Sequence, residues 1–151
     1  MTDQKHAEAA VKLDEQLCFA VYGAAHAFNR TYKQLLEPLG LTYPQYLVML
    51  ALWQDDNQTV KGLGERIGLD SGTLSPLLKR LESGGRIIRR RDSQDERQVL
   101  ISLTAEGAAM KPEAARVMSA IGQATGCDVA ELIDLRDRLN ALSCNLETDE
   151  R

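Results

Sequence analysis

Cys18 is the residue whose type and spacing most directly suggest chemistry in this chain. A thiol reacts with a peroxide as its thiolate, so a reactive cysteine needs nearby hydrogen-bond donors or positive charge, and access for the oxidant. Tyr22 follows four residues later, and on a helix its hydroxyl group would share a face with the sulfur. The pair therefore allows an oxidant-sensing thiol. The alternative is that Cys18 is a small buried hydrophobic residue with tyrosines packed nearby, and spacing alone favours this alternative.

A second informative stretch, from Leu69 to Thr104, begins with an amphipathic helix. Its buried stripe is predicted from four leucines at helical spacing: Leu74, Leu77, Leu78 and Leu81. The opposite face carries short hydroxyl groups and cations: Ser71, Thr73, Ser75, Lys79 and Arg80. Such side chains hydrogen-bond to phosphates and base edges in a DNA major groove. Ser71 or Thr73 is expected to cap the helix, which would leave Pro76 in or just beyond its first turn.

A basic hairpin is expected directly after this helix. Glycines at 84–85 form the turn, residues 86–91 form the first strand, and residues 92–96 form a polar tip. Apolar residues at alternating positions then predict a return strand from Arg97 to Leu103. The predicted fold is therefore mainly α with a small β-hairpin wing, as in a winged helix-turn-helix.

Positive charge is concentrated in this region. Lys79 to Arg97 contains seven cations and four acids, whereas the rest of the chain contains eleven cations and eighteen acids. A local surplus of this kind suits docking on one face of a DNA duplex. In the wing, Arg89, Arg91 and Arg97 are the expected DNA contacts. Asp95 is expected to orient the Arg97 guanidinium for the minor groove through a charge-assisted hydrogen bond. The alternative is an ordinary solvated basic hairpin, which the preceding helix disfavours.

Two short helices are predicted to complete a DNA-binding region at residues 42–104. Thr42 is expected to cap the first of them, with Pro44 just inside the helix, and Thr59 to cap the second.

Longer helices are predicted on both sides of that region. The first begins at Leu13 and ends near Pro38, because the residue before a proline leaves the α region. After the wing, a helix opens at Thr104, is interrupted by Pro112 and ends at a break around Gly126. A partner chain is expected to cover the apolar stripe of the last helix. The stripe consists of Val129, Leu132, Ile133, Leu139, Leu142 and Leu146.

Length and composition indicate one domain, 1–151, in which segments 13–37 and 105–146 are dimerisation helices. The odd number of cysteines and the polar start, Met1–Lys12, indicate the reducing cytoplasm rather than secretion. The apolar stretch Leu17–Phe28 is well short of the roughly 20 residues that a membrane span needs.

The order of these elements and the wing sequence resemble the MarR family of dimeric bacterial repressors over nearly the whole chain. The wing residues concerned are 92–97, with Val99 and 102–104 after them. Three further motifs resemble the organic-hydroperoxide-sensing branch of that family, OhrR. They are LCFAVY at 17–22, LTYPQY at 41–46 and LDSGTL at 69–74.

This resemblance implies a homodimer that binds a palindromic operator and represses a peroxide-detoxification gene until Cys18 is oxidised. It also matches Tyr32 to a second tyrosine of the sensor site. At 1.5 Å per residue, Tyr32 lies about 21 Å along a straight helix from Cys18, so it would have to come from the other subunit. Cys127 resembles the resolving cysteine of a two-cysteine subgroup, in which the sensor sulfenic acid is captured as an intersubunit disulfide. Cys144 matches no role and is expected to pack.

The chain departs from the pattern of the family it resembles at two positions. Arg86 stands where that family usually has an apolar residue, and Gly62 stands where it usually has a helix-forming residue. A MarR-type repressor that responds to a small aromatic ligand remains an alternative function. A thiol peroxidase would leave the DNA-binding module unexplained. No cofactor or metal is expected, since the histidines and cysteines lack the close spacing of a metal site.

Overall fold

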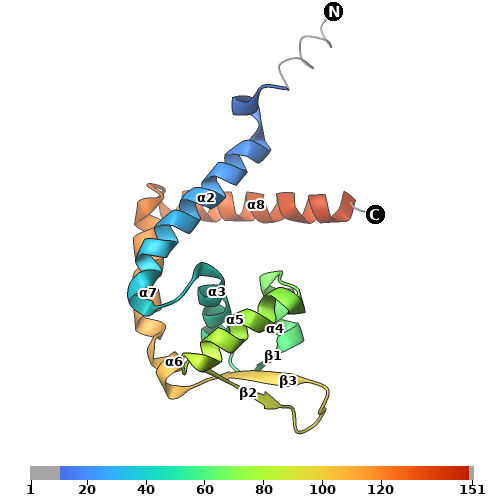
Figure 1. Ribbon diagram of the computed structural model, residues 1–151. Helices are drawn as coiled ribbons and strands as arrows, with labels where there is room; N and C mark the ends of the chain where they lie inside the picture. The colour runs from blue at the N-terminus through green and yellow to red at the C-terminus, as the bar shows by residue number, and fades with distance from the viewer. Residues whose placement is uncertain (1–10, 150–151) are drawn as a thin grey trace, which may run out of the picture. The chain divides into compact units, whose positions relative to one another are not determined.

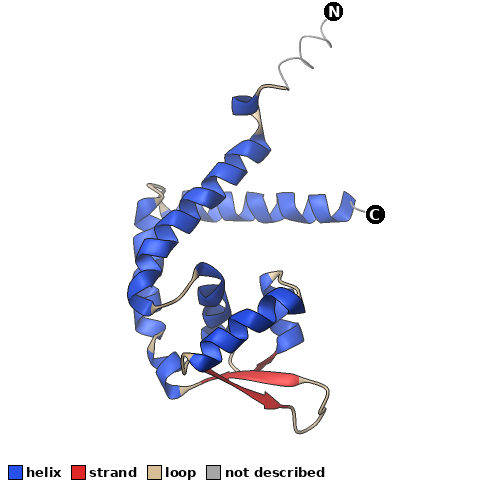
Figure 2. Cartoon of the chain, in the orientation of Figure 1, coloured by secondary structure: helices blue, strands red, loops and turns tan. Residues whose placement is uncertain are grey.

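The computed structural model describes residues 11–149. Figure 1 labels the elements and Figure 2 shows that helix dominates. Their bounds are η1 (Leu13–Glu15), α2 (Leu17–Leu36), η2 (Glu37–Leu39), α3 (Tyr43–Gln54), β1 (Gln58–Thr59), α4 (Val60–Ile67), α5 (Ser71–Ser83), β2 (Ile87–Arg91), β3 (Val99–Leu103), α6 (Ala105–Ala109), α7 (Lys111–Ala124) and α8 (Val129–Asp149). The chain divides into two compact units, one ending at Ala114 and the other beginning at Ala115. Most of the polar stretch Met1–Lys12 lies outside the described residues.

Helix α2 is unbroken from Leu17 to Leu36 and continues into the 3₁₀ turn η2. Its predicted end near Pro38 is confirmed, because Pro38 lies in η2 and Gly40 leaves the helix with φ +66°. Its predicted start at Leu13 is wrong. Gln16 is extended, with φ −82° and ψ 123°, and separates α2 from η1. No side chain caps this start, and Leu13 is 61% exposed, so little packing is available to extend the helix.

Helix α3 is the centre of the first unit. Thr42 caps it in a reciprocal capping box with Gln45, and Pro44 lies in the first turn, as predicted. The core around α3 consists of side chains that are at most 1% exposed: Leu36, Tyr46, Val48, Met49, Leu52, Leu63, Leu74, Leu78, Leu81, Ile87 and Ile101. Full burial of a large aliphatic side chain contributes about 1.5–3 kcal/mol, so this core is the main source of stability.

Helices α4 and α5 form the helix-turn-helix. The Thr59 hydroxyl group accepts a hydrogen bond from the Gly62 N–H and caps α4, as predicted. Gly64 is buried, and a Cβ atom there would lie 2.8 Å from the carbonyl oxygen of Leu69. The segment that connects the two helices therefore passes close to the α4 backbone.

The predicted cap of α5 is wrong. Asp70, rather than Ser71 or Thr73, occupies the N-cap position, and its carboxylate accepts a hydrogen bond of 2.7 Å from the Thr73 N–H. An ionised carboxylate is a stronger acceptor than a hydroxyl group and is favoured at the positive end of a helix. Pro76 consequently lies in the second turn, where it cannot donate the usual backbone hydrogen bond to Gly72.

The wing belongs to an antiparallel sheet with the strand order β1-β3-β2. Strand β3 begins at Val99, opposite Arg91, rather than at Arg97 as predicted. The reason is a turn at the tip, in which the Gln98 N–H donates to the Asp95 carbonyl oxygen. Strand β1 was not predicted, since its two residues are too few to show alternation.

Helix α6 lies close to the base of the wing. Thr104 caps it, and Pro112 lies in the first turn of α7, so the predicted interruption between the two helices is confirmed. A Cβ atom on Gly107 would lie 2.1 Å from the carbonyl oxygen of Arg86, which explains why glycine occupies this position. The Gly107 carbonyl oxygen accepts a hydrogen bond of 2.8 Å from the indole of Trp53.

In the second unit, the predicted break at Gly126 is confirmed, with φ +70° at that residue. Asp128 and Glu131 then form reciprocal hydrogen bonds of 2.9 and 2.8 Å at the start of α8. Much of the predicted apolar stripe is uncovered in the single chain, because Val129, Leu139 and Leu146 are 45–73% exposed. Within residues 11–149, no helix is both long and apolar enough to span a bilayer.

Candidate nucleic-acid interface and thiol site

Helix α5 presents a polar face to solvent. The residues predicted to contact DNA from this helix are all exposed: Ser71, Thr73, Ser75, Lys79 and Arg80. Leu74, Leu78 and Leu81 are buried on the opposite face, which fixes the rotation of the helix about its axis. Hydroxyl and cationic groups are therefore presented together on a surface that can enter a major groove.

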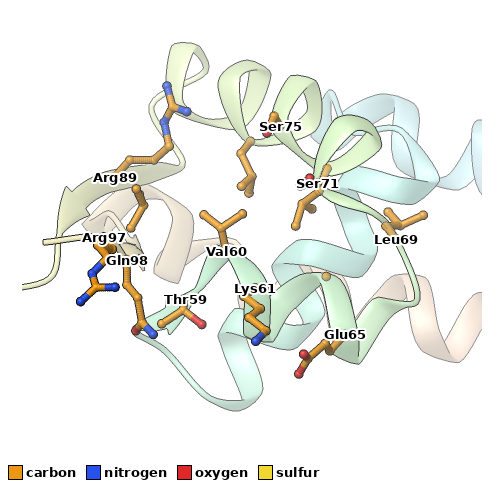
Figure 3. Close-up of a pocket in the computed structure, with 14 residues that line it drawn as sticks. Thr59, Val60, Lys61, Glu65, Leu69, Ser71, Ser75, Arg89, Arg97 and Gln98 are labelled. Atoms are coloured by element: carbon orange, nitrogen blue, oxygen red, sulfur yellow. The ribbon is translucent and has the colours of Figure 1, made fainter. Parts of the chain in front are cut away.

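A hollow of about 560 Å³ lies between α4, α5 and the wing (Figure 3). Its polar lining comes from Thr59, Lys61 and Glu65 of the α4 region, Ser71 and Ser75 of α5, and Arg89, Arg97 and Gln98 of the wing. The sequence did not assign a binding role to Thr59 or Lys61. Their position could have indicated one, because the first helix of a helix-turn-helix crosses the DNA backbone and its N–H groups attract phosphate.

Arg89 connects the wing to α5. Its guanidinium donates a hydrogen bond of 3.1 Å to the carboxylate of Glu82, and the Arg89 side chain is only 31% exposed. The hydrogen bond from Arg89 lowers the pKa of Glu82. Arg89 therefore has a protein partner that its predicted role as a DNA contact did not include, and this partner holds β2 against the recognition helix.

At the wing tip, the Arg97 side chain is 95% exposed. The Asp95 carboxylate accepts a hydrogen bond of 3.2 Å from the Arg97 backbone N–H, whereas the guanidinium Nε lies 3.8 Å from the same oxygen. The expected hydrogen bond to the guanidinium is thus replaced by a hydrogen bond to the backbone and a looser ion pair. Arg91 is exposed at the end of β2.

Cys18 lies near the start of α2 and is exposed, as is Tyr22 one turn later. The Tyr22 ring packs edge-on against His26, with 4.4 Å between ring centroids. Leu17 and Phe19 beside the thiol are 63% and 46% exposed. Cys18 is therefore exposed and does not belong to the core around α3.

Tyr32 lies near the other end of α2, in an aromatic cluster with Tyr43 and Tyr46. Ring centroids are 4.5 Å apart for Tyr32 and Tyr43, and 5.7 Å apart for Tyr32 and Tyr46. Burial and the neighbouring tyrosines raise the pKa of Tyr32 to about 12, which extends the pH range over which its hydroxyl group is protonated. Because α2 is unbroken, Tyr32 and Cys18 of one chain are about 21 Å apart along its axis. The sequence analysis assigned no role to Tyr43, although this residue lies in the LTYPQY motif at 41–46.

Cys127 is half-buried in the segment between α7 and α8. Its backbone N–H donates a hydrogen bond of 3.2 Å to the Thr125 hydroxyl group, and its sulfur lies 3.7 Å from the Thr125 carbonyl oxygen. Cys144 is exposed on α8. Each of the three cysteines is a free thiol.

Sequence comparisons identify the family. The family model described as transcriptional regulator SarA/Rot matches residues 30–113. The chain is 46% identical over 138 residues to the organic hydroperoxide resistance transcriptional regulator of Bacillus subtilis, covering 91% of the chain and 92% of that protein. The chain belongs to the SarA/Rot-type, MarR-like family of winged-helix regulators. It is also 49% identical over 142 residues to the HTH-type transcriptional regulator TtmR of Methylorubrum extorquens, covering 89% of the chain and 73% of TtmR.

Solved structures of AbfR, a regulator known from Staphylococcus epidermidis, share the winged-helix fold. Reduced AbfR bound to DNA superposes with a TM-score of 0.81 at 31% identity, covering 100% of both chains. The disulfide form of AbfR gives 0.68 at 34% identity, covering 94% of this chain and 98% of AbfR. The predicted fold class and family resemblance are confirmed. The chain is a transcriptional regulator, and this membership disfavours an enzymatic role.

Proposed function

We propose that this regulator is a homodimeric, thiol-switched repressor that releases a palindromic DNA operator when an organic hydroperoxide oxidises Cys18. The observation that carries the proposal is the exposed Cys18 thiol, one helical turn before Tyr22, on an uncovered face of α2. The likeness to the Bacillus subtilis organic hydroperoxide resistance regulator supports the same oxidant class.

In the DNA-bound state, α5 lies in the major groove. The exposed serines, threonine, Lys79 and Arg80 of this helix contact bases and phosphates there. Thr59 and Lys61 contact the phosphate backbone beside the hollow, and Arg91 and Arg97 extend from the wing toward the minor groove. Two-fold symmetry places the second recognition helix about one turn of DNA, roughly 34 Å, away.

Oxidation begins when the Cys18 thiolate attacks the terminal oxygen of the hydroperoxide. An S–O bond forms, the O–O bond breaks, and the alkoxide leaves and is protonated to an alcohol. The sulfur becomes a sulfenic acid and loses two electrons to the peroxide. Tyr22 and the partner subunit's Tyr32 donate hydrogen bonds at this site. With a pKa raised to about 12, the Tyr32 hydroxyl group keeps its proton, and so its capacity to donate, well above neutral pH.

Cys127 of the partner subunit then resolves the sulfenic acid. Its thiolate attacks the Cys18 sulfur, an S–S bond forms, and the S–O bond breaks with hydroxide leaving as water after protonation. A disulfide requires the two Cα atoms to lie within about 7 Å, so a wider resting separation must be closed by helix movement. Such movement displaces the recognition helices from their operator spacing. The disulfide form of AbfR supports this step by analogy.

Fluorescence-anisotropy titration of the promoter duplex upstream of the chain's own gene tests this proposal. Reduced protein, hydroperoxide-treated protein and treated Cys18→Ser are compared, and only the treated wild type is expected to lose binding. Treated Cys127→Ser is expected to stop at the sulfenic acid or a mixed disulfide, whereas Cys144→Ser, the matched control on α8, responds as the wild type.

The second candidate is a regulator that responds to a small aromatic ligand. The observation that favours it is the Tyr46 hydroxyl group, which is buried and has no hydrogen-bond partner among the described residues. Tyr46 lies in the aromatic cluster with Tyr32, and its ring is 6.4 Å from that of Trp53. Equal loss of DNA binding in treated Cys18→Ser, or no loss in either protein, would favour this second function.

A further inference from the structure

Among the described residues, Arg86 is the one charged side chain at the base of the wing that forms a hydrogen bond with the end of α2. It is half-buried between the end of α5 and the start of β2. Its guanidinium Nη2 donates a hydrogen bond of 2.7 Å to the carbonyl oxygen of Leu39. Leu39 is the last residue of η2, the turn that continues α2.

The Leu39 carbonyl is a suitable partner for a cation. The last carbonyl groups of a helix lack partners within the helix and carry partial negative charge. At the end of α2, backbone N–H groups of Leu41 and Gly40 satisfy the carbonyl oxygens of Leu36 and Glu37. Arg86 satisfies that of Leu39 from a different part of the fold, so it acts as a C-terminal cap supplied by the wing.

Glycines leave room for this arrangement. A Cβ atom on Gly84 would lie 2.5 Å from Arg86 Nη1, and one on Gly40 would lie 3.1 Å from Nη2. The Nε atom of Arg86 is buried without a hydrogen-bond partner in the described part of the chain. A residue that only filled space would not require a guanidinium with a buried Nε atom, since an apolar side chain avoids the cost of an unpaired polar atom.

The Arg86 backbone adds two further connections. Its N–H donates a hydrogen bond of 3.0 Å to Leu81 at the end of α5, and its carbonyl oxygen accepts one of 3.1 Å from Thr104 at the end of β3. One residue therefore bonds to the end of α2, the end of the recognition helix and the base of the wing.

We infer that Arg86 is a positioning residue that couples the end of α2 to α5 and the wing. Displacement of α2 is passed through the Leu39 carbonyl to the elements that contact DNA. The identity of the signal rests on the proposed function, in which α2 carries the sensor Cys18, but the mechanical link does not.

Hydrogen–deuterium exchange of the full-length protein, with and without the promoter duplex, measures this link without any oxidant. Coupling is reciprocal, so DNA binding is expected to slow exchange of backbone amides at 36–41 in the wild type. Arg86→Leu is expected to reduce this DNA-induced slowing by about fivefold or more. The matched control Arg90→Leu removes the same charge from an exposed neighbouring position and is expected to retain it.

Gly84→Ala tests the link without changing Arg86. The backbone of Gly84, with φ −77°, accommodates alanine, so the added methyl group acts mainly by displacing Nη1. Gly84→Ala is expected to reproduce the effect of Arg86→Leu and to add nothing in an Arg86→Leu background. Arg86→Lys keeps a donor and is expected to restore part of the coupling.

The inference would be overturned if DNA slowed amide exchange at 36–41 in both Arg86→Leu and Gly84→Ala as much as in the wild type. It would also be overturned if DNA did not slow this exchange in the wild type. Thermal unfolding establishes that each variant is folded, and Gly84→Ala with Arg86→Lys decide the matter if Arg86→Leu does not fold. Hydroperoxide treatment is a separate arm. If the wild type retains DNA after treatment while the exchange results are as expected, the thiol switch fails and the Arg86 link stands.

Discussion

The DNA-binding region at 42–104 and helix α8 contrast in how their apolar side chains are covered. In the DNA-binding region, the inner apolar side chains of α3, α4 and α5 are at most 1% exposed within one chain: Tyr46, Val48, Met49, Leu52, Leu63, Leu74, Leu78 and Leu81. In α8, Val129, Ile133, Leu139 and Leu146 are 45–73% exposed. Leu17, Phe19 and Phe28 of α2 are 44–63% exposed as well. The first region contains its own packing partners, whereas the long helices expose apolar side chains in the single chain, and the proposed dimer would cover them.

The largest effect is expected from opening the core of the first region. Leu78 is 1% exposed, so Leu78→Ala should lower the free energy of unfolding by about 2–5 kcal/mol through lost burial and a residual cavity. Urea denaturation measures this change. The control Ile88→Ala, at an apolar wing position that is 41% exposed, should change it by less than about 0.5 kcal/mol. Similar losses in both variants would contradict the contrast between covered and uncovered apolar residues.

A charge on the uncovered face of α8 should separate the proposed dimer. Leu139 is 45% exposed in the single chain, and burying a glutamate against a second chain at this position is strongly unfavourable. Leu139→Glu should therefore give monomers in sedimentation-velocity runs and weaken operator binding on the order of 100-fold, because two half-sites are no longer bound together. Asn140→Glu adds the same charge to an exposed polar neighbour and should remain dimeric. A dimeric Leu139→Glu protein would exclude this face as the interface.

Within the DNA-binding region, Arg97 and Arg89 should behave differently. Arg97 is 95% exposed, so Arg97→Ala should weaken operator binding about fivefold or more and leave the thermal midpoint unchanged. The slope of the logarithm of the binding constant against the logarithm of salt concentration should become shallower by about one, because one phosphate contact is lost. Arg89→Ala removes the hydrogen bond to Glu82 and should lower the thermal midpoint as well as the affinity. Anisotropy titrations at several salt concentrations, with thermal unfolding, measure both. Unchanged affinity of Arg97→Ala at physiological salt would remove Arg97 from the interface.

The smallest effect concerns the α5 cap. Hydrogen bonds from the Thr73 backbone and side chain lower the pKa of Asp70 from its ordinary value of 3.8. The ionised cap therefore stabilises the folded state fully at pH values above 3.8. This contribution should disappear as pH falls through the lowered pKa. Asp70→Ala should have a lower thermal midpoint than the wild type at pH 7 and a smaller decrease on acidification. Ser71→Ala should retain the wild-type pH dependence, and the reverse result would restore Ser71 as the cap.

Much of the first unit could be predicted from local sequence, because its signals lie within a few residues of each other. Thr42, Thr59 and Thr104 each cap a helix by accepting a hydrogen bond from the backbone N–H group three residues later. The error at α5 has the same local origin, since Asp70 directly precedes the expected caps and only the backbone conformation selects it over Ser71 or Thr73. The late start of α2 could not be read from the regular spacing of Leu13 and Leu17, because spacing does not report that Leu13 lacks packing.

The candidate site divides in a similar way. The exposed polar face of α5 follows from the burial of Leu74, Leu78 and Leu81, and both were predicted from spacing. Leu77, which was also predicted in the buried stripe, is half-buried. Tyr43 stacks on Tyr32, and Lys61 faces the hollow beside α5, through packing between elements that no spacing rule describes.

By itself, the sequence determined the caps of α3, α4 and α6, the rotation of the recognition helix and the basic wing, because each depends on short-range hydrogen bonds or on the period of a helix or strand. Only the tertiary structure decided the partners of Arg89 and Arg86. Glu82 is seven residues from Arg89, and Leu39 is 47 residues from Arg86. The second of these partners is a main-chain carbonyl, which every residue possesses, so no side-chain pattern marks it before the chain folds.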